Sequence, residues 1–306
     1  IGRKGVGVNP LRGQNNVQGA ADMGCQPHQG AGYYEVADEK NQKFYTEKYG
    51  VTHPTKPGLK IPEMFDAAIN KELKGLWIIG EDIVQTDPNS AHVVEAMNSL
   101  ELLVVQEIFM SETAKLATVV LPGTTFLEKD GTFTNTERRI QRVNRAVPPL
   151  PGTKPDGVIV TDMMQKLGFD QPTYDAEKML KEIADVVPFF KGVTRERLGK
   201  LGLQWPVQED GTDTQILHTE SFKLGRGRLK NFDWKESTEI ETNKKEYPLI
   251  LTTSRVLQHY NAATMTRRTK NINIVNEDVL LIHPKDAAHR DINTGDIGRL
   301  YSGRGE

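Results

Sequence analysis

The chain has 306 residues, which exceeds the ~250–300 residues at which a single core usually stops growing, so two or more packed units are expected. A content of 37% hydrophobic and 26% charged residues is typical of globular proteins and excludes disordered and collagen-like classes. With 39 Lys and Arg against 41 Asp and Glu, the net charge of −2 gives no general attraction to nucleic acid or to an anionic membrane.

Cysteine and histidine usage limits the metal chemistry of the chain. Cys25 is the only cysteine, so an internal disulfide or a four-cysteine cluster within the chain is excluded. The seven histidines show no i, i+4 pair, and we assign no metal ligand to the chain itself. No apolar run approaches the ~20 residues of a membrane span, and no signal-peptide pattern is present, which favours a cytoplasmic location. The start at Ile1 and the strand-like pattern at the other end favour a piece of a longer protein.

The first half of the chain alternates between helical and strand-like patterns. Residues 1–34 are rich in glycine, asparagine and glutamine, which predicts a loop that forms part of a site. From Pro62 the apolar residues follow a helical period, and a buried strand is predicted over 76–79. The same alternation then predicts a helix near Val93 and two further buried strands, over 102–105 and 118–121. Strands that alternate with helices predict a Rossmann-like parallel α/β sheet.

The second half changes from helical to strand-like patterns. The basic stretch 137–145 is helix-like and more typical of a solvated face than of a nucleic-acid surface. A proline-rich linker at 147–152 precedes a mostly helical region, with helices expected over 163–167 and 179–187. From Tyr247 a β-rich domain is predicted, with strands over the segments 248–253, 279–282 and 295–301.

Arg12 is the first candidate site residue. It follows a proline and precedes Gly13, so its planar guanidinium stands where a ligand can come close to the backbone. That setting suits a small carboxylate or a phosphate, and Gln14 adds a neutral donor and acceptor. The alternative is a surface arginine in a polar loop, which the spacing alone favours.

A second candidate site follows the predicted strand over 76–79. Gly80, Glu81 and Asp82 stand at the carboxyl end of that strand, and Gln106 ends the next strand. Open parallel sheets bind ligands at this edge, and an ionised carboxylate accepts two adjacent hydrogen bonds, as from a guanine edge or a ribose diol. The alternative for Asp82 is helix capping.

A third candidate lies at the start of the β-rich domain. Its hydroxyl, guanidinium and imidazole groups could hold phosphates, although a single histidine is more often structural. The residues are Thr253, Arg255, His259 and Tyr260. A direct nicotinamide-binding fingerprint is rejected, because the segments Gly5–Gly7 and Gly225–Gly227 lack the required third glycine.

Taken together, these motifs resemble the molybdopterin oxidoreductases, and the first resembles that of formate dehydrogenase catalytic subunits. The resemblance covers essentially the whole chain, as the central and later part of a longer subunit. The segments that carry it, in chain order, are Arg12–Gly24, Gly80–Asp82, Gln106–Phe109, Leu121–Gly123 and Gly131–Gln141.

The resemblance implies a cofactor and a role for each candidate. The cofactor is a bis-molybdopterin guanine dinucleotide with molybdenum or tungsten, and Arg12 matches the arginine that orients formate, with Gln14 near the pterin. Asp82 matches the residue that reads a guanine, and Gly80, Glu81 and Gln106 line the same nucleotide pocket. The third candidate group matches the start of a C-terminal cofactor-binding β-barrel domain.

The resemblance also implies an organisation into four regions. These are a loop segment of the preceding domain at 1–34, an α/β guanine-nucleotide domain at 35–146, a mostly helical connection at 147–243 and the first part of the β-barrel domain at 244–306. The family's metal-ligating cysteine or selenocysteine, its neighbouring histidine and its cysteine set for a [4Fe–4S] cluster are absent from the sequence. We therefore expect the isolated chain to be inactive.

The activity implied for the whole protein is reversible oxidation of formate to carbon dioxide. Electrons would pass to iron–sulfur or flavin centres of partner subunits or domains, with no nucleic acid and no membrane span involved. Two alternatives stay open. One is another enzyme of the same superfamily, such as a nitrate reductase, and the other is a non-catalytic cofactor-binding module.

Overall fold

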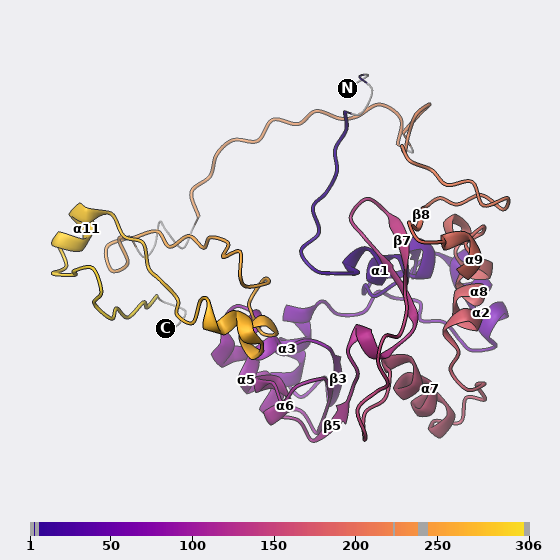
Figure 1. Ribbon diagram of the computed structural model, residues 1–306, viewed down its shortest axis with the longest axis horizontal. Helices are drawn as coiled ribbons and strands as arrows, with labels where there is room; N and C mark the ends of the chain where they lie inside the picture. Colours follow the sequence, from indigo (N-terminus) through magenta and orange to yellow (C-terminus); the bar gives the residue numbers. More distant parts are fainter. Residues whose placement is uncertain (1–2, 4–5, 223, 238–243, 303–306) are drawn as a thin grey trace. The chain divides into compact units, whose positions relative to one another are not determined.

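The computed structural model describes residues 3, 6–222, 224–237 and 244–302. The chain divides into two compact units. One consists of Ile1–Glu81 with Ala96–Lys223, and the other of Asp82–Glu95 with Leu224–Glu306. Figure 1 follows the chain from indigo at the N-terminus to yellow at the C-terminus.

The first unit contains the predicted parallel sheet. Its strands are β3 (Gly75–Ile79), β4 (Leu102–Glu107) and β5 (Val119–Pro122), paired in the order β3-β4-β5. Both pairings are parallel, which confirms the predicted α/β sheet. Leu103 and Val105, which share one face of the central strand, are almost completely buried. The helix α6 (Glu112–Lys115) packs against β4.

The helix predicted from Pro62 is α3 (Ile61–Ile69). Proline in the first turn is compatible with a helix start, and the Glu63 carboxylate accepts a hydrogen bond from the Lys60 N–H at 2.7 Å. Phe65 and Ala68 are buried, which is the apolar face that the sequence predicted. The helix near Val93 is α5 (Ser90–Ser99).

Short elements follow the N-terminal loop. They are α1 (Val17–Asp22), β1 (Gln29–Gly30), the 3₁₀ turn η1 (Ala31–Tyr33), β2 (Tyr34–Glu35) and α2 (Glu39–Tyr49). Asp38 caps α2 by accepting hydrogen bonds from the N–H groups of Lys40 and Asn41. Gly50 ends it with a φ of 68°, a conformation that favours glycine.

A second, antiparallel sheet corrects the helix-like prediction for 137–145. Its strands are β6 (Gly131–Thr134), β7 (Arg139–Val143) and β8 (Leu203–Gln204), in that order. The Asn135 side chain accepts hydrogen bonds from the N–H groups of Glu137 and Arg139, and Arg138 adopts a φ of 66°. These contacts close a hairpin turn, so this local turn chemistry overrides the helical appearance of the charged stretch.

The helices predicted after the linker are present. They are α7 (Asp156–Lys166) and α8 (Ala176–Val186), followed by the 3₁₀ turn η3 (Pro188–Phe190) and the short α9 (Arg195–Leu198). Another 3₁₀ turn, η2 (Phe126–Glu128), precedes β6. Beyond β8, the described residues 205–222 and 224–237 contain no helix or strand, so the helical part of the predicted connection ends at Leu198.

The second unit contains short helical elements. They are α4 (Ile83–Thr86), the first part of α5, the 3₁₀ turns η4 (Thr266–Arg268) and η5 (Lys270–Asn273) and α11 (Pro284–Ala288). The strands predicted over 248–253, 279–282 and 295–301 are not formed in the described residues 244–302. A strand exists only where its backbone pairs with another, and these three segments form no ladder with one another.

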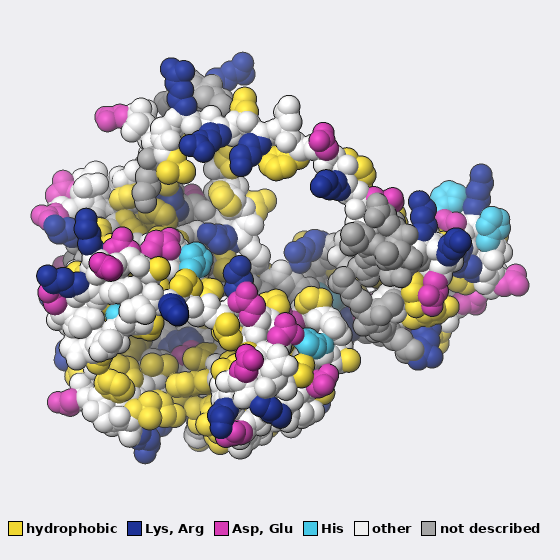
Figure 2. All heavy atoms as spheres, turned by 180° about the vertical axis from the view of Figure 1, so that it is seen from behind, with side chains coloured by type: hydrophobic (Ala, Val, Ile, Leu, Met, Phe, Trp, Pro, Cys, Tyr) yellow, Lys and Arg dark blue, Asp and Glu magenta, His cyan; other side chains and the backbone are white. Residues whose placement is uncertain are grey.

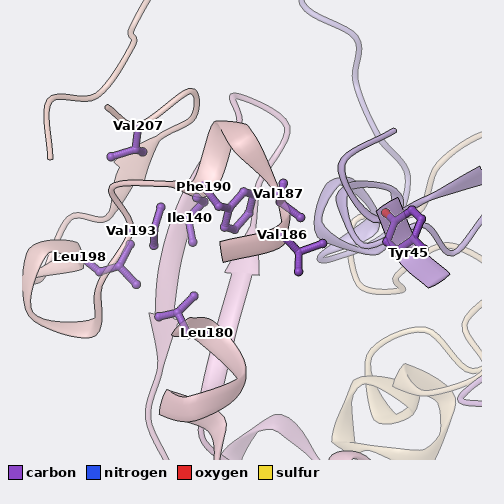
Figure 3. Close-up of a cluster of buried hydrophobic side chains, with 9 residues drawn as sticks. All are labelled: Tyr45, Ile140, Leu180, Val186, Val187, Phe190, Val193, Leu198 and Val207. Carbon is purple, nitrogen blue, oxygen red and sulfur yellow. The ribbon is translucent and has the colours of Figure 1, made fainter. Parts of the chain in front are cut away.

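The main buried cluster of the first unit lies between the second sheet and the helices that follow it. Figure 3 shows aliphatic side chains and one phenylalanine gathered around β7, α8 and α9. The members are Tyr45, Ile140, Leu180, Val186, Val187, Phe190, Val193, Leu198 and Val207. On the face drawn in Figure 2, basic and acidic side chains are interspersed, in keeping with the near-zero net charge.

Truncating the centre of this cluster should destabilise the protein. We expect Ile140→Ala to lower the free energy of unfolding by about 2–5 kcal/mol, because Ile140 is fully buried and the lost methyl groups leave a cavity. Leu201→Ala is the control, since Leu201 is 79% exposed and its change should stay within about 0.5 kcal/mol. Urea denaturation of the purified protein measures both, and equal losses would contradict the assigned core.

Candidate functional site

Arg12 and Gln14 lie in an exposed loop that precedes α1. Residues 6–12 have no regular structure, and both side chains are exposed. Val8 and Leu11 are 97% and 87% exposed, so this loop has little packing of its own. The guanidinium is therefore accessible to a ligand, as the sequence predicted for a loop that presents an arginine.

A buried carboxylate, Asp22, lies at the end of α1. One oxygen accepts hydrogen bonds from the Tyr33 hydroxyl at 2.7 Å and the Gln18 amide at 2.9 Å, and the other accepts from the Trp205 indole at 2.9 Å. Burial raises the pKa of Asp22, while these three hydrogen bonds and the charge of Arg12 act in the opposite direction. Burial and the Asp22 carboxylate together raise the pKa of Tyr33. Sequence analysis missed this group, because its members come from three separate segments.

Gly80 and Glu81 follow β3 at the carboxyl edge of the parallel sheet. Gly80 adopts a φ of 65°, which strains any other residue, and its N–H donates to the Gln106 carbonyl at 2.8 Å. The hydrogen bond links the ends of β3 and β4. The Glu81 side chain is exposed beside this turn.

Asp82 begins the second unit and is 5% exposed. It occupies the N-cap position of α4, yet its side chain makes no capping hydrogen bond. One carboxylate oxygen instead accepts from the Gln85 amide at 2.6 Å. The alternative prediction of a helix-capping carboxylate is therefore not what the geometry shows.

Gln106 is a buried residue of β4 whose side chain continues into a polar group. Its amide nitrogen donates to Asp156 at 2.7 Å, and the other oxygen of Asp156 accepts from the Lys129 ammonium. The Gln106 side-chain oxygen and the Thr124 hydroxyl are buried without a hydrogen-bond partner. Unsatisfied buried polar atoms are rare in native proteins, so these two indicate a place where a polar ligand is expected.

A cavity of about 300 Å³ in the first unit borders this polar group. Lys129 and Asp156 line one part of it, and Asn16 and Gly19 of the segment that follows Arg12 line another. Its volume lies at the lower end of the roughly 300–1,000 Å³ of small-molecule sites. Asp156 and Lys129 are therefore candidate site residues that the sequence did not indicate, because the helix predicted over 163–167 begins in the structure at Asp156.

The third candidate group lies within the second unit. The His259 ring donates from Nε2 to the Val275 carbonyl at 2.7 Å, so Nδ1 is the acceptor for the Thr266 hydroxyl at 3.0 Å. The same hydroxyl accepts from the Tyr260 N–H at 3.2 Å. His259 and Tyr260 are thus brought together in one turn. Arg255 donates to the Asn261 side chain at 3.1 Å, and Thr253 is exposed.

The described residues contain neither a group of metal-ligating side chains nor a membrane-spanning helix. Within residues 3, 6–222, 224–237 and 244–302, no three His, Cys, Asp or Glu side chains are grouped as metal ligands. None of the helices in the described part of the chain has the length and apolar character needed to cross a bilayer.

The parallel α/β sheet with polar side chains at its carboxyl edge is the architecture of a nucleotide- or cofactor-binding protein. Residues 1–166 match the family model of the molybdopterin oxidoreductases, and residues 249–306 match that of the molybdopterin dinucleotide-binding domain. The chain belongs to the molybdopterin oxidoreductase family. This confirms the resemblance found in the sequence.

Curated relatives align along the whole chain. The F420-dependent formate dehydrogenase subunit alpha of Methanocaldococcus jannaschii is 45% identical over 100% of this chain and 46% of its own length. The subunit alpha of F420-dependent formate dehydrogenase 1 of Methanococcus maripaludis is 43% identical over the same shares. A probable oxidoreductase of Bacillus subtilis, YjgC, is 40% identical over 98% of this chain and 31% of its own. The chain thus spans less than half the length of these relatives.

A solved structure shares the fold. Acetylene hydratase from Pelobacter acetylenicus matches with a TM-score of 0.57 at 20% sequence identity, covering 83% of this chain and 38% of its own. At this identity the match concerns the fold alone.

The polar group at the sheet edge should contribute to stability. Asp156→Ala leaves the buried Gln106 amide and the Lys129 ammonium without their partner, which should cost about 1–3 kcal/mol. Asp162→Ala is the matched control on the same helix, since its ion pair with Lys154 is more exposed and is worth at most about 1 kcal/mol. Chemical denaturation compares the two variants, and equal losses would argue against the connected group.

Proposed function

We propose that the chain is the central and later part of the catalytic subunit of a molybdenum- or tungsten-dependent formate dehydrogenase. The observation that supports this most is the alignment of the whole chain, at 45% identity, with a subunit named formate dehydrogenase alpha. In the complete protein, the reaction is reversible oxidation of formate to carbon dioxide.

The residues of the chain fit the dinucleotide cofactor of the family. At the sheet edge, the unpaired Gln106 oxygen and Thr124 hydroxyl offer an acceptor and a donor to a polar ligand. Asp82 offers a carboxylate that can accept from the adjacent N–H groups of guanine. Gly80 and Glu81 would line the same nucleotide pocket, and Gln14 would lie near the pterin.

The second unit supplies the other proposed contacts. Thr253, Arg255, His259 and Tyr260 fall in the segment matched by the dinucleotide-binding family model. Their hydroxyl, guanidinium and imidazole groups suit phosphates and ribose. We propose that this segment belongs to a β-barrel domain whose strands are paired in the complete subunit, and that the four regions predicted from the sequence describe the chain's organisation.

Arg12 would act on the substrate. Its guanidinium holds the formate carboxylate by two parallel charge-assisted hydrogen bonds, which are worth on the order of 1.5–3 kcal/mol each. This orients the C–H bond towards the reaction centre. The bound cofactor supplies the two-electron redox step, and the chain supplies binding, orientation and electrostatics.

Partners and location follow from the same proposal. Electrons would pass to a [4Fe–4S] cluster of the complete subunit and to iron–sulfur or flavin centres of partner subunits or domains. We propose a cytoplasmic location for the protein. Several relatives are named F420-dependent, and we propose an F420-dependent partner as one electron acceptor.

Two alternatives have specific tests. Another superfamily enzyme, such as a nitrate reductase, would reduce its own substrate and leave formate unchanged when the complete subunit is assayed. A non-catalytic module would bind the dinucleotide but would neither oxidise formate nor reduce nitrate. The formate proposal is favoured by the relatives' names and by the Arg12–Gly24 motif.

Arg12→Lys should separate substrate orientation from cofactor binding. In the full-length enzyme we expect formate turnover to fall by on the order of 100-fold with cofactor content unchanged, because lysine keeps the charge and loses the planar fork. Arg145→Lys is the control at another exposed arginine. Steady-state kinetics and metal analysis provide the readouts, and wild-type turnover in Arg12→Lys would remove Arg12 from the site.

Asp82→Asn should weaken guanine binding. The amide replaces one acceptor oxygen by a donor that faces a guanine N–H, and the mismatch should cost roughly 1–3 kcal/mol. The full-length variant purified from cells should then contain less guanine nucleotide after acid release, in proportion to lost metal. Asp87→Asn is the control at the other end of α4. Equal guanine content in both variants would show that Asp82 does not read the base.

A further inference from the structure

The loop that carries Arg12 depends on α1 for its position. The loop has no regular structure, whereas α1 begins five residues after Arg12. A six-residue helix is too short to be stable by itself, so α1 must be held by contacts with other elements. Whatever holds α1 therefore also determines where the guanidinium lies.

The start of α1 is tied to the second sheet. Asn16 precedes the helix with a φ of 57°, and its side chain makes no capping hydrogen bond. Its side-chain oxygen instead accepts from the Thr134 N–H on β6 at 2.9 Å. A Cβ at Gly19 would collide with the Asn16 side chain and displace it from this contact.

The end of α1 is held by Asp22, which is completely buried. All three partners donate hydrogen bonds to Asp22. An ionised carboxylate accepts all three and carries no proton that would need an acceptor. Burying a charge is costly unless it is paired or hydrogen-bonded. The three donors therefore compensate a negative charge on Asp22 in the interior.

Trp205, the most distant of these partners in sequence, is itself held in place. The guanidinium of Arg138 lies 5.3 Å from the Trp205 ring centroid and donates to the Trp205 carbonyl. Arg138 also donates to the carbonyls of Thr214 and Gln215, both at 3.1 Å. The Phe189 ring centroid also lies 4.6 Å from that of Trp205 and 5.8 Å from that of Tyr33. The indole N–H thus meets Asp22 from a rigid position.

The charge of Arg12 reaches this group. It opposes the rise that burial causes in the pKa of Asp22 and in the pKa of Tyr33. Arg12, Asp22 and Tyr33 are the titratable or charged groups that interact here, and Arg138 faces them through Trp205.

We infer that Asp22 is a positioning residue for Arg12: its carboxylate, held by Tyr33, Gln18 and Trp205, anchors α1, the helix that follows the Arg12 loop. The inference rests on the proposed role of Arg12 in binding formate. It assigns to Asp22 a part in substrate orientation without contact with the substrate.

The first test measures the anchor without using activity. In the full-length holoenzyme, Asp22→Asn and Trp205→Phe should speed hydrogen–deuterium exchange at the amides of residues 11–22 by at least about tenfold. Trp205→Phe keeps an aromatic ring and removes the N–H donor together with part of the indole. Asp170→Asn is an exposed control, and Trp77→Phe is a matched one, because the Trp77 indole N–H has no hydrogen-bond partner. Unchanged exchange in both test variants would overturn the inference.

The second test measures coupling to Arg12. Asp22→Asn should lower formate turnover by on the order of 100-fold in the wild-type enzyme. In the Arg12→Lys background the same substitution should lower it by less than about twofold, because the planar fork it positions is already absent. If the loss of formate turnover in the double variant equals the product of the two single losses, Asp22 acts independently of Arg12, and the inference is overturned.

The two arms also separate this inference from the proposed function. If the wild-type holoenzyme does not oxidise formate, the proposed function fails, and the exchange of residues 11–22 still decides whether Asp22 anchors the loop. If formate is oxidised and exchange is unchanged in Asp22→Asn, the proposed function stands and the role of Asp22 falls.

Discussion

The hydrogen bond from the Trp205 indole to the Asp22 carboxylate joins two segments that are 183 positions apart. One segment follows the Arg12 loop, and the other follows β8. Because Asp22 is fully buried, its charge is tolerated only while its donors are in place. The position of α1, and of the loop before it, therefore depends on a segment that comes much later in the sequence of the first unit.

A second polar group, at the edge of the parallel sheet, differs from the Asp22 group in that its hydrogen bonding is incomplete. At the edge of the parallel sheet, Gln106 and Thr124 each keep one buried atom without a partner, although Asp156 and Lys129 satisfy the rest of the group. The Asp22 group is complete and rigid, as expected of a support. The sheet-edge group is incomplete, as expected of a surface that receives a ligand.

These polar groups matter for holding the elements in place because the strands and helices are short. Three parallel strands of four to six residues bury little apolar area, and the larger hydrophobic cluster lies instead around β7, α8 and α9. Arg138, in the β6–β7 turn, connects that cluster's sheet to the Asp22 group through Trp205. The motif Gly131–Gln141, which the sequence marks as a family signature, thus contributes a structural brace.

The sequence alone determined the parallel sheet, the helices α3, α5, α7 and α8, and the family, because each depends on local periodicity or on contiguous motifs. It also located Arg12, Asp82 and Gln106 at a loop or at strand ends. Only the tertiary structure decided that 137–145 forms a hairpin, because Asn135 closes the turn with its side chain. It likewise decided that Asp156 meets Gln106 and that Trp205 meets Asp22, because no local pattern encodes contacts between residues 50 and 183 positions apart.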